Sequence, residues 1–344
     1  MHAHCTLVPP YILQAIARQA EPASREAAIS TLALDRTFAV NRVLAAGARP
    51  SLAAAPAVLR REIADAGGTE ELPGTVVRRE GDPPSADVAV DEAYDGLGAT
   101  WRLYDEAYGR NSIDDAGLRL DGTVHFGQAY DNAYWDGERM VFGDGDGEIF
   151  ERFTVAVDVI GHELTHGVTG ATADLEYRNQ AGALNESVSD VFGSLVKQRL
   201  LGQTAEQANW LIGEGLLAPG VHGVALRSMK APGTAYDDER LGGRDPQPAH
   251  VRDYVRTTSD NGGVHTNSGI PNHAFYLAAV ALGGNAWERA GRVWYEVLTG
   301  GELSRTATFP QFAQLTVAAA DRLFGTDART AVEEAWIGVG LVVR

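Results

Sequence analysis

Hydrophobic and polar positions alternate in two different ways along the chain, and the change falls near residue 160. Between residues 65 and 155, short apolar runs are separated by turns rich in Gly and Asp, which is typical of strands. The expected strands are Thr75–Val77, Asp87–Val90, Gly122–Phe126, Arg139–Phe142 and Glu148–Phe153. Beyond residue 155, apolar positions recur every three to four residues, which predicts helices. These helices are expected over 155–169, 182–200, 205–215, 268–282, 285–299, 309–323 and 326–338. The pattern therefore predicts a β-rich part and a helical part, with a cleft where the two meet.

The first 60 residues form a third region. Apolar positions at helical spacing predict helices over residues 12–44, with a break at Pro22. Small residues punctuated by Gly and Pro then continue to Pro56, a composition typical of linkers. Composition alone fits two interpretations: a removable segment with a cleavable linker, or an ordinary N-terminal subdomain.

Charge and composition exclude several classes of protein. The chain has 344 residues and a formal net charge of −17, which argues against a nucleic-acid binder because phosphate contacts need clustered Lys and Arg. No apolar run reaches the roughly 20 residues of a membrane helix. The first ten residues lack the basic cluster and apolar core of a secretory signal. We therefore expect a cytoplasmic protein or one released by a non-classical route, with secretion as the alternative. The single cysteine, Cys5, excludes an intramolecular disulfide and an all-Cys metal site.

The string His162-Glu163-Leu164-Thr165-His166 lies on one of the predicted helices. Two His four residues apart share a helix face, about 40° apart around the axis and about 6 Å along it. Both imidazoles can therefore reach one Zn²⁺ ion. Glu163 lies beside them, where it can act on water rather than bind the metal. The alternative is a pair of surface histidines on a helix.

A catalytic zinc needs a third protein ligand. The metzincin arrangement is disfavoured because Thr172, and not a His, lies six residues after the second His. Glu186 and Asp190 lie one turn apart on a later helix and offer a carboxylate ligand together with an acceptor for the free ring N–H of a zinc-bound His. A solvated helix face is the alternative for this pair. Asp158 lies two helical turns from the second His and cannot share the same ion.

Five sequence blocks in this order resemble the thermolysin family of zinc metallopeptidases. They are Asn132–Trp135, His162–His166, Gly182–Glu186 with Ser189-Asp190, Leu226–Met229, and Asp260–His265 with Asn267–Gly269. The Pro9–Leu13 box resembles the protealysin-like subgroup, whose precursors carry a short propeptide. The resemblance implies an α+β, two-domain fold: a β-rich N-terminal domain, an α-helical C-terminal domain and the zinc helix in the cleft. It places a helical propeptide and linker at 1–60, the first catalytic domain at 61–165 and the second at 166–344.

The resemblance also implies roles for individual residues. His162, His166 and Glu186 are expected to bind one catalytic zinc, and Asp190 to support a zinc-bound His. Glu163 is expected to act as general base.

Other residues are expected to stabilise the oxyanion and to bind the substrate. Tyr177 and His265 would donate to the oxyanion, and Asp260 would hold the His265 imidazole. The expected substrate-binding residues are Asn132, Ala133, Tyr134 and Arg227, with Phe150, Val159, Ile212, Leu216 and Leu226 lining an apolar pocket.

The chain departs from the family at the double calcium site of secreted thermolysins. Asp158 and Glu214 fit that site, but Lys197, Asn209 and Leu211 replace three of its carboxylates. Calcium affinity follows the number of charged ligands, so calcium is possible elsewhere but the double site is predicted to be absent. Lys197 is expected to pair with the two remaining acids.

These inferences predict a zinc metalloendopeptidase in precursor form, which cleaves before large hydrophobic residues and is activated by a cut near 45–60. Its expected partners are peptide or protein substrates and its own propeptide as an intramolecular inhibitor. We expect a monomer that binds neither nucleic acid nor membrane. Cys5 is a possible fourth zinc ligand in the latent form. An aminopeptidase of the same zinc class and a non-catalytic zinc-fold binding protein are the alternatives.

Overall fold

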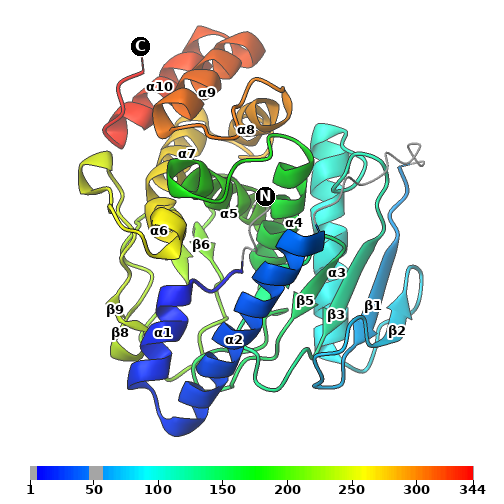
Figure 1. Cartoon of the computed structure of the whole chain (residues 1–344). Coiled ribbons are helices and arrows are strands. Elements are labelled where there is room, and N and C mark those ends of the chain that lie inside the picture. The colour runs from blue at the N-terminus through cyan, green and yellow to red at the C-terminus, as the bar shows by residue number, and fades with distance from the viewer. Residues whose placement is uncertain (1–5, 46–56, 344) are drawn as a thin grey trace.

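The computed structural model describes residues 6–45 and 57–343 (Figure 1). For residues 38–45 it describes the backbone but not the side chains. Cys5 and most of the predicted linker lie outside the described residues, so the proposed thiolate ligand stays a prediction. The fold is α+β, as predicted: a sheet-containing part precedes a helical part. Within the described ranges, no helix is both long and apolar enough to span a bilayer.

One mixed sheet forms the core of the first part. Its strand order is β2-β1-β3-β5-β4, in which β1 runs parallel to β3 and β3 parallel to β5, while the pairs β1–β2 and β4–β5 are antiparallel. The strands are β1 Arg61–Asp65, β2 Thr75–Arg79, β3 Leu120–Val124, β4 Ala133–Trp135 and β5 Arg139–Phe142. The helix α3 Val88–Arg102 packs against this sheet and continues into the π-helix η1 Leu103–Ala107.

Two of the predicted strands in this part are wrong. The Asp87–Val90 segment begins α3 instead, because the Asp87 side chain caps the helix by accepting from the backbone N–H of Ala89 at 2.8 Å. The 148–153 segment is a loop with one isolated bridge, Phe150 to Leu217. Asp146 Oδ1 accepts from three successive backbone N–H groups there, which favours a turn over an extended strand.

The helical part is built around the pair α4 Val157–Ala171 and α5 Asn179–Leu201. These two helices approach closely where each carries a Gly. A Cβ at Gly193 would lie 2.3 Å from the Asp158 carbonyl oxygen, and one at Gly161 would lie 3.0 Å from the Gly193 Cα. The close approach brings side chains of the two helices within reach of one ion. The remaining helices are α6 Asp260–Asn267, α7 Gly269–Leu282, α8 Ala290–Thr299, α9 Phe309–Phe324 and α10 Thr326–Gly338.

The helix predicted over 205–215 is also wrong. Trp210, Gly213 and Gly215 all have positive φ, at 60°, 74° and 85°, which no right-handed helix accommodates. The segment instead contains the short strand β6 Leu211–Ile212, which pairs antiparallel with β7 Arg227–Ser228. The other short elements are β8 Asp237–Asp238, β9 Gly243–Arg244 and the 3₁₀ helices η2 Glu239–Leu241 and η3 Val251–Asp253.

Residues 6–45, called the leader below, contain the helices α1 Pro10–Gln19 and α2 Pro22–Ala45. The break at Pro22 is as predicted. Figure 1 shows both helices in blue across one face of the molecule, with the chain before α1 running toward α4 and α5. The leader is docked through apolar side chains that are at most 1% exposed, namely those of Leu7, Val8, Ile12, Leu13 and Ile16.

Candidate active site

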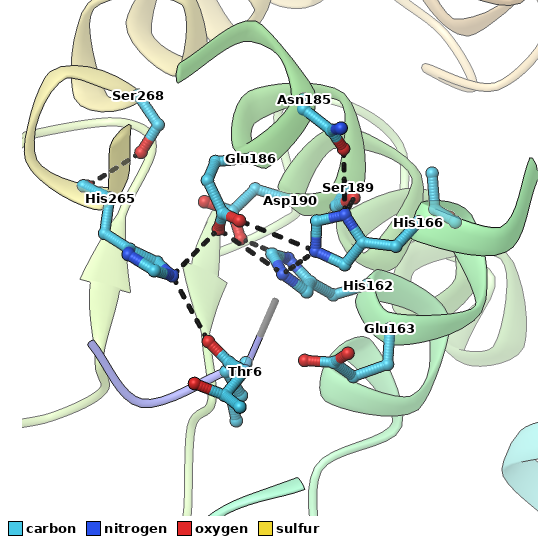
Figure 2. A network of polar contacts seen from close by, with 12 residues as sticks. Thr6, His162, Glu163, His166, Asn185, Glu186, Ser189, Asp190, His265 and Ser268 are labelled. Carbon is cyan, nitrogen blue, oxygen red and sulfur yellow. Dashed lines mark hydrogen bonds and ion pairs between the residues drawn. The ribbon is translucent and has the colours of Figure 1, made fainter. Parts of the chain in front are cut away.

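Two helices bring three potential metal ligands together. His162 and His166 come from α4 and Glu186 comes from α5 (Figure 2). The two imidazole Nε2 atoms lie 3.0 Å apart, and each lies 3.6 Å from a carboxylate oxygen of Glu186. All the ligand atoms lie within 4.8 Å of one another. The i, i+4 geometry predicted from the sequence is therefore present.

The opposite ring nitrogens are held by hydrogen-bond acceptors. His162 Nδ1 donates to Asp190 Oδ1 and His166 Nδ1 donates to Asn185 Oδ1, each at 2.8 Å. Because the protons are on Nδ1, the Nε2 atoms of the neutral rings direct lone pairs into the same small space. Two lone pairs at 3.0 Å repel each other unless a cation lies between them, and tetrahedral zinc places two imidazole nitrogens about 3.3 Å apart. The donor set of two imidazoles and one carboxylate therefore fits zinc.

The charge states of these ligands suit metal binding. Burial lowers the pKa of His166 to about 3, although Glu186 opposes the shift, so this imidazole is neutral. Burial raises the pKa of Glu186, but nearby positive charge, chiefly that of His265, outweighs burial and lowers it to about 2. A neutral imidazole and an ionised carboxylate are the forms that bind a metal ion.

Glu163 lies next to this cluster and is fully buried. Its Oε2 accepts from the backbone N–H of Trp135 at 3.1 Å, which orients the carboxylate from the β4 side. Burial and the nearby charge of Glu186 raise the pKa of Glu163 well above its ordinary value. A carboxylate with a raised pKa is a stronger proton acceptor, as a general base requires.

The other wall of the site carries hydrogen-bond donors. Tyr177 Oη donates to Glu186 at 2.5 Å and lies 3.1 Å from His265 Nε2. Asp260 accepts from both the Nδ1 and the backbone N–H of His265, at 2.7 and 3.0 Å. Burial lowers the pKa of His265, but Asp260 and Glu186 outweigh it and raise the pKa to about 9. The imidazole is thus a cation that donates from both nitrogens.

Asp190 is the centre of a buried network. Besides His162, it accepts from Arg227 Nε and Nη2, both at 2.9 Å, and from Asn272 Nδ2 at 2.8 Å. Burial raises the pKa of Asp190, but the charge of Arg227 and the hydrogen bond from His162 outweigh burial and lower it. Sequence reasoning did not identify Asn272 or Asn185 as supporting residues. The sequence feature that could have identified them is a polar residue on an otherwise apolar helix face.

The predicted substrate-binding residues fall into two groups. Asn132, Ala133 and Arg227 line the path of the leader backbone and hydrogen-bond to it, whereas the Tyr134 ring lies in a separate aromatic cluster with Phe126 and Tyr130. The contact of Tyr134 with substrate stays a prediction. The pocket residues are all at most 2% exposed: Phe150, Val159, Ile212, Leu216 and Leu226.

At the position where the double calcium site is predicted to be absent, Lys197 lies between two acids. Its Nζ donates to Asp158 at 3.1 Å and to Glu214 at 2.9 Å, as predicted from the sequence. Asn209 Nδ2 also donates to Glu214, at 2.7 Å, and the Leu211 carbonyl lies 3.5 Å from the ammonium. A cationic side chain thus holds the space between these carboxylates.

Comparison with known proteins agrees with this geometry. A model of the thermolysin metallopeptidase catalytic domain matches residues 61–170, and one of the thermolysin metallopeptidase alpha-helical domain matches 173–341. An extracellular metalloprotease of Pectobacterium carotovorum subsp. carotovorum is 53% identical over 340 residues, covering 99% of this chain and 97% of the relative. An extracellular minor metalloprotease of Serratia marcescens is 43% identical, covering 83% of this chain and 79% of the relative. The precursor of protealysin, a metalloproteinase from Serratia proteamaculans, superposes with a TM-score of 0.90 at 52% identity, covering 98% of this chain and 100% of that one.

The chain belongs to the thermolysin family of metallopeptidases and is a zinc metalloendopeptidase. Within the family it is protealysin-like, and its propeptide corresponds to that of the precursor structure. Neither an aminopeptidase nor a non-catalytic binding protein is favoured. The prediction of a cytoplasmic or non-classically released protein is wrong, because relatives of this similarity are named extracellular enzymes and point to secretion. The absence of a recognisable signal in ten residues was too weak a basis for that prediction.

Proposed function

We propose that this chain is the latent precursor of an extracellular endopeptidase in which His162, His166 and Glu186 hold the zinc and Glu163 is the general base. The observation that carries the proposal is the convergence of these three ligands beside a buried carboxylate of raised pKa. We assign residues 1–60 to the propeptide and linker, 61–165 to the first catalytic domain and 166–344 to the second.

Glu163 moves the proton in this mechanism. Zinc, when bound, lowers the pKa of water and polarises the peptide carbonyl. Glu163 takes a proton from the attacking water and delivers it to the departing amine nitrogen. Its hydrogen bond from the Trp135 N–H fixes the direction in which the carboxylate faces.

His265 and Tyr177 stabilise the charge that develops on the carbonyl oxygen. The His265 cation donates from Nε2 while Asp260 holds its Nδ1, so the ring is oriented before the substrate arrives. Tyr177 Oη lies within hydrogen-bonding distance of the same Nε2, which places both donors at one point.

Substrate is bound through its backbone and one side chain. Asn132, Ala133 and Arg227 hold the backbone, and the residue after the cleaved bond enters the apolar pocket that includes Ile212 and Leu226. Burying a large aliphatic or aromatic side chain is worth about 1.5–3 kcal/mol, so we expect a preference for Leu or Phe and not a unique sequence.

The leader inhibits the site by occupying it. Its backbone contacts the same three residues that we assign to substrate, and its apolar side chains are buried. Activation requires a cut in the linker near 45–60 followed by release of the leader. We also propose that the protein is a monomer. We propose that the double calcium site is absent, because the Lys197 ammonium lies between Asp158 and Glu214.

Degradation of casein tests the proposal. The zinc-loaded protein is expected to degrade casein after self-activation and to stop when a zinc chelator is added. Glu163→Gln should lower the rate about 10²–10⁴-fold while zinc content and folding stay unchanged. Glu138→Gln, a matched change at a side chain that is 75% exposed, should retain full activity. Undiminished casein degradation by Glu163→Gln would contradict the assignment of the base.

A further inference from the structure

The leader backbone crosses the active site from Thr6 to Val8 and bends at Leu7 and Val8. The Thr6 carbonyl oxygen lies 3.2 Å from His265 Nε2, and the Leu7 N–H donates to the Ala133 carbonyl at 3.2 Å. The Leu7 carbonyl accepts from Arg227 Nη1 at 3.2 Å, and the Val8 N–H donates to Asn132 Oδ1 at 2.9 Å. Each peptide group in this stretch thus has its own partner.

The order of these partners defines the direction of the chain. The carbonyl of Thr6 is the one that faces the oxyanion donor His265, as Figure 2 shows, and Glu163 points into the same region from α4. The next N–H belongs to Leu7 and donates to the Ala133 carbonyl. The peptide bond between Thr6 and Leu7 therefore lies where the proposed mechanism attacks a substrate.

We propose that the Thr6–Leu7 bond of the leader is itself a substrate of this active site and is hydrolysed within the precursor. The inference rests on the proposed function. One water molecule is consumed: its oxygen joins the Thr6 carbonyl carbon, the C–N bond breaks, and Thr6 becomes a C-terminal carboxylate. Glu163 carries a proton from the water to the Leu7 nitrogen, which becomes the new α-amino group.

The residues after this bond explain why the cut does not release the leader. The side chains of Leu7 and Val8 are fully buried, and so are those of Leu13 and Ile16 on α1. Burial of these four aliphatic side chains keeps the remaining leader docked after the first six residues are removed. The trimmed precursor is therefore still latent, and the linker cut is a separate later step.

Intact-mass measurement and N-terminal sequencing of the full-length protein test the proposal. The zinc-loaded wild-type protein should accumulate a chain that begins at Leu7, before casein-degrading activity rises. Because the bond is cut within one molecule, the rate should not change on tenfold dilution. Glu163→Gln should retain residues 1–6. Leu7→Phe should keep the cut, whereas Leu7→Asp should slow it at least tenfold, because the side chain of residue 7 is fully buried when the leader is docked and burial of a charge is unfavourable.

A second readout does not depend on catalysis. In Glu163→Gln, the amide hydrogens of Leu7 and Val8 should exchange with solvent at least tenfold more slowly than in the double variant with Leu7→Asp. Equal exchange rates would overturn the register. If casein is degraded after activation while the Thr6–Leu7 bond is never cut, this inference is wrong and the proposed function stands. If neither casein nor the leader is cut, the proposed function itself fails.

Discussion

Asp35, on α2 of the leader, is hydrogen-bonded to Asn132 of the active site. One carboxylate oxygen of Asp35 accepts from Asn132 Nδ2 at 3.0 Å, and the other accepts from Tyr130 Oη at 2.6 Å. Asn132 also accepts from the Val8 N–H through its Oδ1, so this one side chain is bonded to two parts of the leader. Burial raises the pKa of Asp35 to about 7, although the bonds from Tyr130 and Asn132 oppose the shift. Among the described side chains, no cation forms an ion pair with Asp35.

The leader is expected to bind more weakly as the pH rises. The pKa of Asp35 is about 7 when docked and 3.8 ordinarily, so docking takes up a proton between these values. The stabilisation of the docked leader by protonation of Asp35 is fully present below about pH 4 and is lost as the pH rises through 7. From the two pKa values, the equilibrium constant for docking of the leader should fall by at most about 90-fold between pH 5 and pH 8. The rate at which an added protease digests the leader at each pH measures this weakening. The Glu163→Gln variant is used so that the protein does not cleave itself.

Asp35→Asn is the matched control for this pH dependence. It keeps a hydrogen-bonding side chain of the same size but cannot ionise, so leader release should become nearly independent of pH. Asp35→Ala removes the bonds and should loosen the leader at every pH. The idea is refuted if Asp35→Asn retains the wild-type pH profile.

His125 is expected to make the stability of the first domain depend on pH. Its Nε2 lies 2.8 Å from Asp87 Oδ2 and its Nδ1 lies 2.9 Å from Asp144, which bridges the start of α3 and the Gly-rich loop. Burial lowers the pKa of His125, but Asp144 and Asp87 outweigh it and raise the pKa above 6.5. The stabilisation is therefore present below pH 6.5 and is lost as the pH rises through the raised pKa.

Thermal unfolding of Glu163→Gln with and without His125→Gln measures this effect. The His125→Gln change should lower stability by about 0.5–1 kcal/mol at pH 6, since both acids are partly exposed, and by less at pH 9. An equal loss at both pH values would show that the charge of His125 contributes nothing.

Asn272 is expected to increase the affinity for zinc without contacting the ion. Its Nδ2 donates to Asp190, which in turn holds the ring of His162. Asn272→Ala should weaken zinc binding about 10-fold, because groups that support a ligand typically contribute 10–100-fold. Competition with a chromophoric chelator measures the zinc Kd. Asn285→Ala, in the loop after α7, is the control, and an unchanged Kd for a folded Asn272→Ala protein would contradict the prediction.

Lys197 is expected to replace calcium as the stabilising charge. Lys197→Met leaves Asp158, which is 1% exposed, without its counter-charge and should cost about 2 kcal/mol or more. The Tm of the wild-type protein should not respond to calcium or to a calcium chelator, whereas Lys197→Glu should gain stability on addition of calcium. A wild-type Tm that falls by several degrees in the chelator would contradict this.

Sequence patterns predicted the parts of this protein that depend on neighbouring residues. The spacing of His162 and His166, and of Glu186 and Asp190, fixes which side chains share a helix face, and helical periodicity located α4 and α5 to within a few residues. The strand predicted at Asp87–Val90 failed because two Val residues two apart also fit the first turn of a capped helix. The helix predicted over 205–215 failed because its apolar spacing concealed residues with positive φ.

Features that join distant residues could not be derived in this way. The bond between Val8 and Asn132 spans 124 positions, and that between Asp190 and Asn272 spans 82. The pairing of leader backbone groups with active-site atoms depends on how whole helices and strands pack. The spacing of neighbouring residues does not determine that packing, so only the structure shows the direction of the leader.

Because Leu7 and Val8 bond to the residues that we propose to bind substrate, we expect latency and turnover in this protein to be subject to the same selection. A substitution at Arg227 or Asn132 that increased the affinity for external polypeptides would also slow release of the leader. Natural variation that favours faster digestion is therefore expected to accumulate in the helices and linker of the leader, where it can change the timing of activation without altering the cleft.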